Sequence, residues 1–337
     1  VSGGFELVAQ VFQDNFDVYG DIGASFCVRI HGKVVVDLWG GHQDHKAEPP
    51  VAWNAQTVTN VYSCTKGMAN LCILKLIDQG HLSFDTRVAS IWPDFGANGK
   101  ETITIEQLLT HQAGLNILGD HRISGEDLIQ WTDYLQGNME HHPLYDILVA
   151  QKPLWQLNEG TFAYHPLSIG FYISEIVRHA DPKGRSVQKF WRDEIADPFD
   201  IDFYIGLQRD FDSSRLARLV SSATLEDGAP ADAAKPITSR PCDSFPLFSK
   251  TTGTHEPHIP KELEEDLPTI ISRSFTLVKR FSPWKTRFVE LPSGIGFGNA
   301  RALSKAFGLL ACAPTSPVER IVGPKTASKA LEKSIEG

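Results

Sequence analysis

The stretch that decides the fold is TNVYSCTKGMANLCILKLIDQG, residues 59–80. It begins with β-branched and aromatic residues and continues as an apolar run, which is typical of a helix buried along most of its surface. Gly80 is placed to end that helix. Ser63 and Lys66 stand where the helix begins. The other residues of this helix are suited to burial, so a lysine one turn inside it calls for a chemical explanation.

Ser63 and Lys66 form an S-x-x-K pattern, and a spacing of three residues places both side chains on one side of a helix. Burial disfavours the ammonium form, so we expect a lowered pKa for Lys66. Such a lysine can accept the proton of a serine hydroxyl, which is otherwise a weak nucleophile. The helix N-terminus adds partial positive charge beside Ser63, whose own N–H is a natural first donor of an oxyanion hole.

The pattern alone is weak, because the chain contains it three times. The copy at residues 282–285 includes a proline and lies in an irregular segment. The copy at Ser186 and Lys189 begins a polar helix, from which Lys189 is expected to point to solvent. Only the Ser63 copy opens a buried helix. The pattern also leaves an alternative open, in which Ser63 caps the helix and Lys66 extends its charged end to water.

The expected order of elements is a helix, two strands and then a long helical body. A β-hairpin is followed by a loop, and Thr104 with Gln107 has the spacing of a capping box for a short helix that ends near Gly114. A lone hairpin is marginal in water, and no segment after residue 290 has the pattern of a strand. The expected elements are a helix at 5–19, strands at 24–30 and 34–39 closed by Gly40-Gly41, a loop at 46–56, mainly helix at 124–230, a surface excursion at 228–270, and helices at 299–312 and 325–335.

Composition excludes several function classes. The 337 residues are 42% hydrophobic and 22% charged, as in an ordinary globular protein, and length alone suggests about two domains. A net charge of −9 argues against a nucleic-acid partner. No apolar run is long enough to span a membrane, and the first residues, which start with Val rather than Met, lack the features of a signal peptide.

The cysteines and histidines do not indicate a metal site or a disulfide framework. The five cysteines are odd in number and scattered, which favours a reducing compartment, and we expect a cytoplasmic protein. Two H-x-x-H pairs, His42/His45 and His255/His258, stand in expected loops without further ligands, so we interpret them as surface histidines. No cofactor and no metal is expected.

Several segments in the same order closely resemble the serine β-lactamase-like superfamily, which includes class C β-lactamases, D,D-peptidases and family VIII carboxylesterases. The resemblance is closest to the esterase-like branch, spans nearly the whole chain and is weakest over residues 228–275. The segments are VYSCTKGMANLCILKLIDQGHLSFDTRVASIWPDF (61–95), ITIEQLLTHQAGL (103–115), WQLNEGTFAYHPLSIGFYISEIV (155–177), FWRDEIADPFDIDFYIGL (190–207) and LPSGIGFGNARALSKAFGLLA (291–311).

The resemblance implies roles for particular residues. Ser63 would be acylated by the substrate, Lys66 would assist, and Tyr164, in AYHPLSIG, would complete the proton relay. His165 either orients Tyr164 or is structural, and His111 is expected to be a structural hydrogen-bonding residue at a helix end.

The resemblance also implies a fold, α/β (α+β) of the β-lactamase/transpeptidase-like type. An antiparallel sheet subdomain would carry a large helical subdomain. We expect one domain over residues 1–337. Residues 1–60 would form the helix and hairpin of the sheet subdomain, 61–290 the helical subdomain with the S-x-x-K helix, and 291–337 the C-terminal helices, truncated relative to the family.

Two departures from the family pattern matter. The second residue after Tyr164 is Pro166, where β-lactamases have an asparagine that contacts the lactam amide, and this favours ester substrates. The third motif, K-T-G or an H-x-G variant on a strand beside the site, is not found; KTTG at 250–253 has one residue too many. We expect that the family's C-terminal strands are missing from this chain, which is either a fragment or naturally short.

The predicted function is a serine hydrolase that forms an acyl-enzyme, with a carboxylesterase acting on small acyl esters favoured. The alternatives are a β-lactamase, D,D-peptidase or D-aminopeptidase, and an inactive homologue with a binding or assembly role. The expected partner is a small ester or amide substrate, without nucleic acid and without a membrane span. The acyl chain, the physiological substrate and the oligomeric state are not specified by the sequence.

Overall fold

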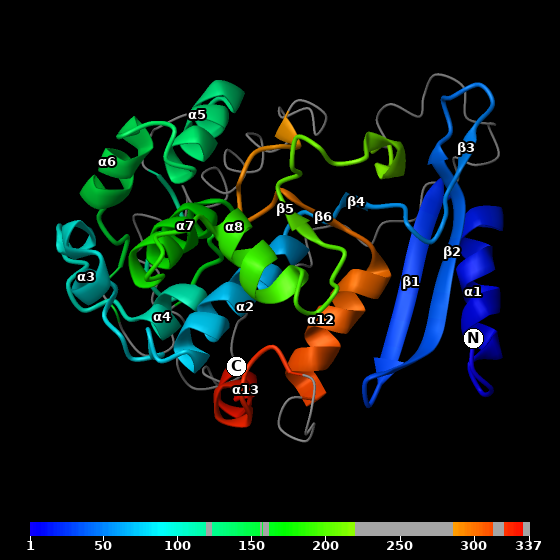
Figure 1. The fold of residues 1–337 in the computed structure, drawn as a ribbon, viewed down its shortest axis with the longest axis horizontal. Helices are drawn as coiled ribbons and strands as arrows, with labels where there is room; N and C mark the ends of the chain where they lie inside the picture. The colour runs from blue at the N-terminus through cyan, green and yellow to red at the C-terminus, as the bar shows by residue number, and fades with distance from the viewer. Residues whose placement is uncertain (119–122, 156, 158–161, 220–285, 313–319, 333–337) are drawn as a thin grey trace.

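The computed structural model describes residues 1–118, 123–155, 157, 162–219, 286–312 and 320–332. A body of helices lies on one side, a three-stranded sheet covered by α1 (Glu6–Asp17) lies on the other, and α12 (Ala300–Cys312) stands between them (Figure 1). The predicted helix at 5–19 is therefore confirmed. Four sequence features lie outside the described residues: the S-x-x-K copy at 282–285, KTTG at 250–253, His255/His258 and the excursion at 228–270.

Helix α2 (Cys64–Asp78) is the centre of the helical body. Nine of its residues are buried, including Lys66, and it ends at Gln79, after which Gly80 adopts a φ of +80°. A positive φ is accessible to glycine without the steric cost that a side chain brings, so Gly80 ends the helix as predicted.

The other helices of the body surround α2. Helix α7 (Ser168–Ala180) packs along α2 and is buried through most of its length. The capping box of Thr104 and Gln107 is present, but α4 (Ile105–Leu109) ends before Gly114, because His111 adopts a φ of +64° that no helix can continue through. The bounds are α3 (Val88–Ile91), η1 (Pro93–Gly96), α4 (Ile105–Leu109), α5 (Gly125–Leu135), α6 (Pro143–Ala150), α7 (Ser168–Ala180), α8 (Val187–Trp191), the π-helix η2 (Arg192–Ala196) and η3 (Ser213–Arg215).

The expected hairpin is present as β1 (Gly23–Ile30) and β2 (Lys33–Asp44). The prediction that Gly40-Gly41 closes the second strand is wrong, since β2 continues and pairs with β3 (Val51–Ala52) inside the expected loop. A Cβ on Gly41 would lie 2.2 Å from the carbonyl oxygen of Ile22. The glycines therefore allow close packing within the strand and do not end it.

A second small sheet corrects the expectation that no strand follows residue 290. Strand β6 (Gly296–Gly298) pairs antiparallel with β4 (Thr59–Asn60) and with β5 (Tyr204–Ile205). Strand β5 also interrupts the stretch expected to be mainly helical, and between η2 and residue 219 the described chain has one further helical element, the 3₁₀ helix η3. The N–H of Val61 donates to Gly296 O at 2.9 Å, so this sheet fixes the chain directly before Ser63.

The two C-terminal helices, α12 and α13 (Pro324–Leu331), are present as predicted, and α12 packs against β1 (Figure 1). Among the helices in the described ranges, none has both the length and the apolar character that crossing a membrane requires. The arrangement of antiparallel strands beside a large helical body agrees with the predicted fold class.

Candidate active site

Ser63 stands where β4 turns into α2. Tyr62, the residue before it, has a φ of +46°, which non-glycine residues rarely adopt. The side chain of Ser63 is exposed and makes no capping hydrogen bond to α2. Within the described part of the chain, no group accepts a hydrogen bond from the Ser63 N–H. The geometry argues against a capping role for Ser63.

Lys66 is buried with only 8% of its surface exposed, and its Nζ lies 3.1 Å from Ser63 Oγ. Two backbone carbonyls also accept hydrogen bonds from this nitrogen, Pro166 O at 2.8 Å and Ser293 O at 2.7 Å. Burial lowers the pKa of Lys66 to about 7. In a neutral amine the two carbonyls take both N–H bonds, which leaves the lone pair directed at Ser63 Oγ. Lys66 is therefore arranged to accept the serine proton.

A second buried lysine shows what a purely structural amine looks like. Lys100 is fully buried, and its Nζ donates to three carbonyls: Ala97 O, Val149 O and Gln151 O, at 2.8, 2.7 and 2.6 Å. Every N–H of this ammonium has an acceptor and none faces a hydroxyl. Lys66 differs because one of its three partners is a serine hydroxyl.

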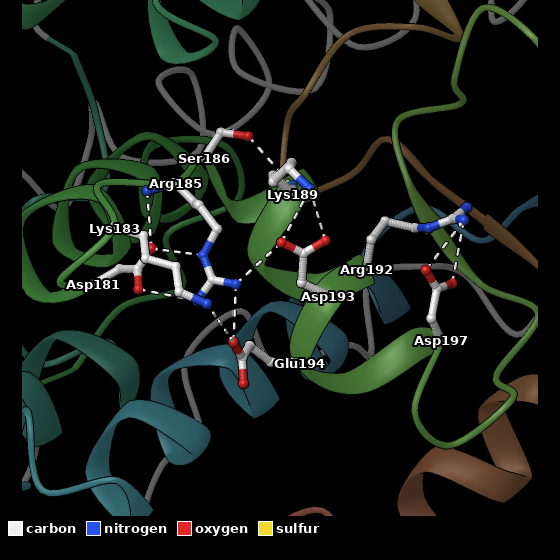
Figure 2. A network of polar contacts seen from close by, with 9 residues as sticks. All are labelled: Asp181, Lys183, Arg185, Ser186, Lys189, Arg192, Asp193, Glu194 and Asp197. Carbon is white, nitrogen blue, oxygen red and sulfur yellow. Dashed lines mark hydrogen bonds and ion pairs between the residues drawn. The ribbon is translucent and has the colours of Figure 1, made fainter.

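The S-x-x-K copy at Ser186 and Lys189 is structural. Ser186 caps α8 by accepting a hydrogen bond from Lys189 N, and the ammonium of Lys189 points away, to both carboxylate oxygens of Asp193 at 2.8 and 3.0 Å (Figure 2). The side chain of Lys189 is 65% exposed, as the sequence predicts. The same spacing therefore produces a helix cap in one place and a serine–lysine contact in another.

Tyr164 brings a second proton-carrying group to Ser63. Its hydroxyl donates to Ser63 Oγ at 2.8 Å, and Lys66 Nζ lies 4.9 Å from the centre of its ring. Burial raises the pKa of Tyr164 above its ordinary value, so the phenol stays protonated at neutral pH. The three residues named from the sequence, Ser63, Lys66 and Tyr164, thus lie together.

The histidines beside the site hold the chain that carries Tyr164. His165 is buried; its Nε2 accepts from Leu115 N at 3.0 Å and its Nδ1 faces Ala163 O at 2.6 Å. His111 accepts a hydrogen bond from His165 N at 3.2 Å through Nδ1. Burial lowers the pKa of His111 to about 4 and that of His165 to about 3, so both are neutral. The contacts of His111 agree with the structural role expected of it, and those of His165 are compatible with both roles expected of it.

The two backbone carbonyls that accept hydrogen bonds from Lys66 Nζ were not predicted from the sequence. In the sequence, Pro166 is notable only because β-lactamases have an asparagine at this position. In the structure, its backbone carbonyl accepts a hydrogen bond from Lys66 Nζ. Ser293 was not singled out, although its carbonyl gives Lys66 its shortest hydrogen bond. Gly170 in α7 packs directly on Ser293, since a Cβ there would lie 2.7 Å from Ser293 N. The glycine allows the loop to approach α7 and so places the Ser293 carbonyl.

We expect Gly170→Ala to lower kcat/KM for an ester by about 10–100-fold, because the methyl group displaces Ser293 from Lys66 and small misplacements of catalytic groups are costly. Gly294→Ala is the matched control in the same loop, since a Cβ on Gly294 meets nothing within 4 Å. Steady-state hydrolysis of p-nitrophenyl butyrate by the two variants measures the difference. Equal activities would show that this loop does not support the lysine.

The chain is similar to known proteins in sequence and in fold. The family model described as Beta-lactamase matches residues 8–331. The esterase/beta-lactamase LipL of Mycobacterium tuberculosis is 33% identical over 198 residues, which are 59% of this chain and 42% of LipL. Protein flp of Staphylococcus aureus is 32% identical over 127 residues, 36% of this chain and 25% of flp. The chain thus matches less than half the length of these two curated relatives.

Two solved structures are similar over the full chain. A family VIII carboxylesterase has a TM-score of 0.73 and 27% identity, with 99% of this chain and 76% of that chain covered. A penicillin-binding protein homologue from Caulobacter crescentus has a TM-score of 0.72 and 30% identity, with 100% of this chain and 77% of that chain covered.

Proposed function

Because the chain belongs to the beta-lactamase family, we propose that it is a serine hydrolase that forms an acyl-enzyme on Ser63. The observation that carries the proposal is the convergence of two proton-carrying groups on one hydroxyl. Lys66 Nζ lies 3.1 Å and Tyr164 Oη 2.8 Å from Ser63 Oγ. In this proposal Ser63 is the nucleophile, Lys66 the base that activates it, and Tyr164 the proton donor to the leaving group.

The reaction proceeds in two steps. Neutral Lys66 takes the proton of Ser63 as Oγ attacks the carbonyl carbon, and the Ser63 N–H donates to the oxyanion that forms. The C–O bond to the alcohol breaks as the Tyr164 hydroxyl protonates the departing oxygen, and the Lys66 ammonium returns a proton to the phenolate. Water then attacks the acyl carbon, with the same groups moving its proton, and releases the acid and Ser63.

We propose a carboxylesterase acting on small acyl esters. Pro166 offers the site only a carbonyl, already bonded to Lys66, and no side-chain amide to hold the amide group of a lactam. The name of LipL includes both esterase and beta-lactamase, and one similar solved structure is a family VIII carboxylesterase. The alternatives are lactam or peptide hydrolysis by the same serine, and an inactive homologue.

We expect kcat/KM for p-nitrophenyl butyrate to exceed that for nitrocefin by about 10–100-fold. This ratio corresponds to the free energy of one hydrogen bond that the site does not form with the lactam amide. Both substrates are chromogenic, so one purified sample serves for both assays. Faster turnover of nitrocefin would replace the esterase proposal with a lactamase.

Labelling with a fluorophosphonate separates an enzyme from an inactive homologue. The reagent phosphonylates activated serines, and intact-mass and peptide mass spectrometry locate the adduct. An adduct on Ser63 supports the proposed nucleophile. A folded protein that gives no adduct and hydrolyses neither substrate would favour a binding or assembly role.

A further inference from the structure

Asn60 occupies a position that connects the two halves of the site without touching the reacting groups. It lies in β4, opposite Phe297 of β6, and is 8% exposed. To other described residues its side chain makes two hydrogen bonds, one to the backbone before Ser63 and one to the loop that carries Ser293. Neither bond reaches Ser63, Lys66 or Tyr164.

The first bond holds the turn that presents the nucleophile. Asn60 Oδ1 accepts from the N–H of Tyr62 at 2.8 Å, and Tyr62 is the residue with a φ of +46°. A bulky side chain in the left-handed region is strained and persists only where its surroundings enforce it. Asn60 supplies such an enforcing contact directly before Ser63.

The second hydrogen bond of Asn60 holds the loop whose carbonyl accepts a hydrogen bond from Lys66. Asn60 Nδ2 donates to Gly294 O at 3.3 Å, and the preceding residue, Ser293, accepts the hydrogen bond from Lys66 at 2.7 Å. The partners of this bond are 234 positions apart in the chain. One side chain therefore sets the orientation of Ser63 and the position of the carbonyl that directs Lys66.

We propose that Asn60 is a positioning residue that fixes the Ser63–Lys66 geometry by joining the Tyr62 turn to the 293–294 loop. The inference rests on the proposed function, because it assigns a part in the activation of Ser63. Loss of Asn60 frees the loop, admits water to Lys66 and returns the amine toward its ordinary basicity. The nucleophile is then both misaligned and less often paired with a neutral base.

Several titratable groups lie near Lys66 and must be separated from it in a pH profile. His111 and His165 have pKa values lowered to about 4 and about 3 and stay neutral, and the raised pKa of Tyr164 keeps its phenol protonated. On α7, Arg178 Nη2 and His179 Nδ1 lie 3.1 and 3.5 Å from Glu175 Oε2. Among the residues that the structure describes, the other groups to consider are Cys64 on α2 itself and the buried Glu290, next to α2 at Cys72.

Asn60→Ala tests the inference through the pH dependence of p-nitrophenyl butyrate hydrolysis. We expect kcat to fall by about 10–100-fold while KM stays within about threefold, because alignment is lost and the substrate pocket is kept. The rising limb of kcat/KM is expected to move to higher pH by about one unit, since a better solvated amine is more basic. Circular dichroism and thermal melting establish that the variant is folded.

Asn299→Ala is the matched control. Asn299, directly before α12, is 6% exposed, accepts from Ala302 N at 2.9 Å and donates to Asp202 Oδ2 at 3.3 Å, so like Asn60 it is buried, accepts from one backbone N–H and donates to one oxygen. It should lose comparable thermal stability and keep the wild-type pH limb. If the rising limb of kcat/KM lies at the same pH in Asn60→Ala and Asn299→Ala, Asn60 has a structural role only.

Asn60→Asp keeps the inference testable if the alanine variant does not fold. The carboxylate retains the acceptor for Tyr62 N and replaces the donor to Gly294 O with an oxygen. Its negative charge also favours an ammonium, so we expect the limb to move to higher pH for both reasons, and an unchanged limb contradicts the proposal. If the wild-type protein neither hydrolyses the ester nor is labelled at Ser63, the proposed function itself fails. If it does both, and the rising limbs of the wild type and the Asn60 variants lie at the same pH, only the inference about Asn60 fails.

Discussion

Replacement of Ser63 with alanine should reduce kcat/KM for p-nitrophenyl butyrate by about 10⁴-fold or more, to the level of residual oxyanion and binding effects. Ser63 Oγ is the atom on which Lys66 Nζ and Tyr164 Oη converge, and no other described hydroxyl has both partners. Alanine removes the nucleophile and leaves the base without a proton to accept. Steady-state kinetics on the purified variant, with fluorophosphonate labelling of the same sample, measures both losses.

Ser186→Ala is the matched control for Ser63→Ala, because it changes the serine of a second S-x-x-K pattern. Ser186 caps α8, so its loss should destabilise the fold by about 1 kcal/mol and leave catalysis intact. The pair separates chemistry from sequence pattern. If Ser63→Ala retains hydrolysis and the adduct maps to another serine, the site has been assigned to the wrong residue.

Replacement of Lys66 with methionine should lower kcat/KM by about 10²–10⁴-fold, the usual contribution of a general base. Methionine fills a similar volume and removes only the amine, so Ser63 keeps its place but has no group to take its proton. Lys189→Met, in the second pattern, removes an exposed ammonium paired with Asp193 and should leave activity unchanged. Activity in Lys66→Met within about threefold of wild type would contradict a role for this amine as the base.

The pH dependence of the wild-type enzyme follows from the lowered pKa of Lys66. The base must be neutral, and with a pKa of about 7 the neutral fraction grows as pH rises through 7. We therefore expect kcat/KM to rise with pH below about 7 and to level off above it. An ordinary lysine, with a pKa of about 10.4, would place the limb near that value. In Lys66→Met the limb should disappear.

Glu290 titrates in the same range and must be distinguished from Lys66. It is fully buried, and burial raises its pKa to about 7, while its Oε1 accepts from Gln188 N at 3.0 Å. Glu290 lies in the segment that leads to Ser293, so a change in the charge of Glu290 can also affect Lys66. Glu290→Gln keeps the shape and removes the titration. If the rise of kcat/KM with pH is kept in Glu290→Gln and lost in Lys66→Met, it reports the titration of Lys66.

Features encoded in neighbouring residues were predictable from sequence. The apolar run of α2 predicts its burial, and the burial of Lys66 follows because the helix has too little polar surface to expose it. The capping box at Thr104 is likewise local, since both partners lie within one turn. The placement of Tyr164 beside Ser63 came from the family resemblance and not from spacing.

The missed features depend on contacts between distant segments. Strand β6 has glycine at two of its three positions, so its own strand propensity is low and it forms because β4 and β5 flank it. Its glycines are required by space, as a Cβ on Gly296 would lie 2.3 Å from Thr65 Oγ1. The acceptors of Lys66 are backbone carbonyls of Pro166 and Ser293, and any residue has a carbonyl. No residue type marks such a partner in a sequence.

The most direct test of the central claim is the rate of fluorophosphonate labelling of Ser63 as a function of pH. Labelling needs only the activated nucleophile, so it reports the serine–lysine pair without deacylation or product release. We predict a rate that rises through a single limb near pH 7, kept in Glu290→Gln and lost in Lys66→Met. A rate that is flat, that rises only above about pH 9, or that keeps its limb without the lysine would contradict a dry, neutral amine as the base of this site.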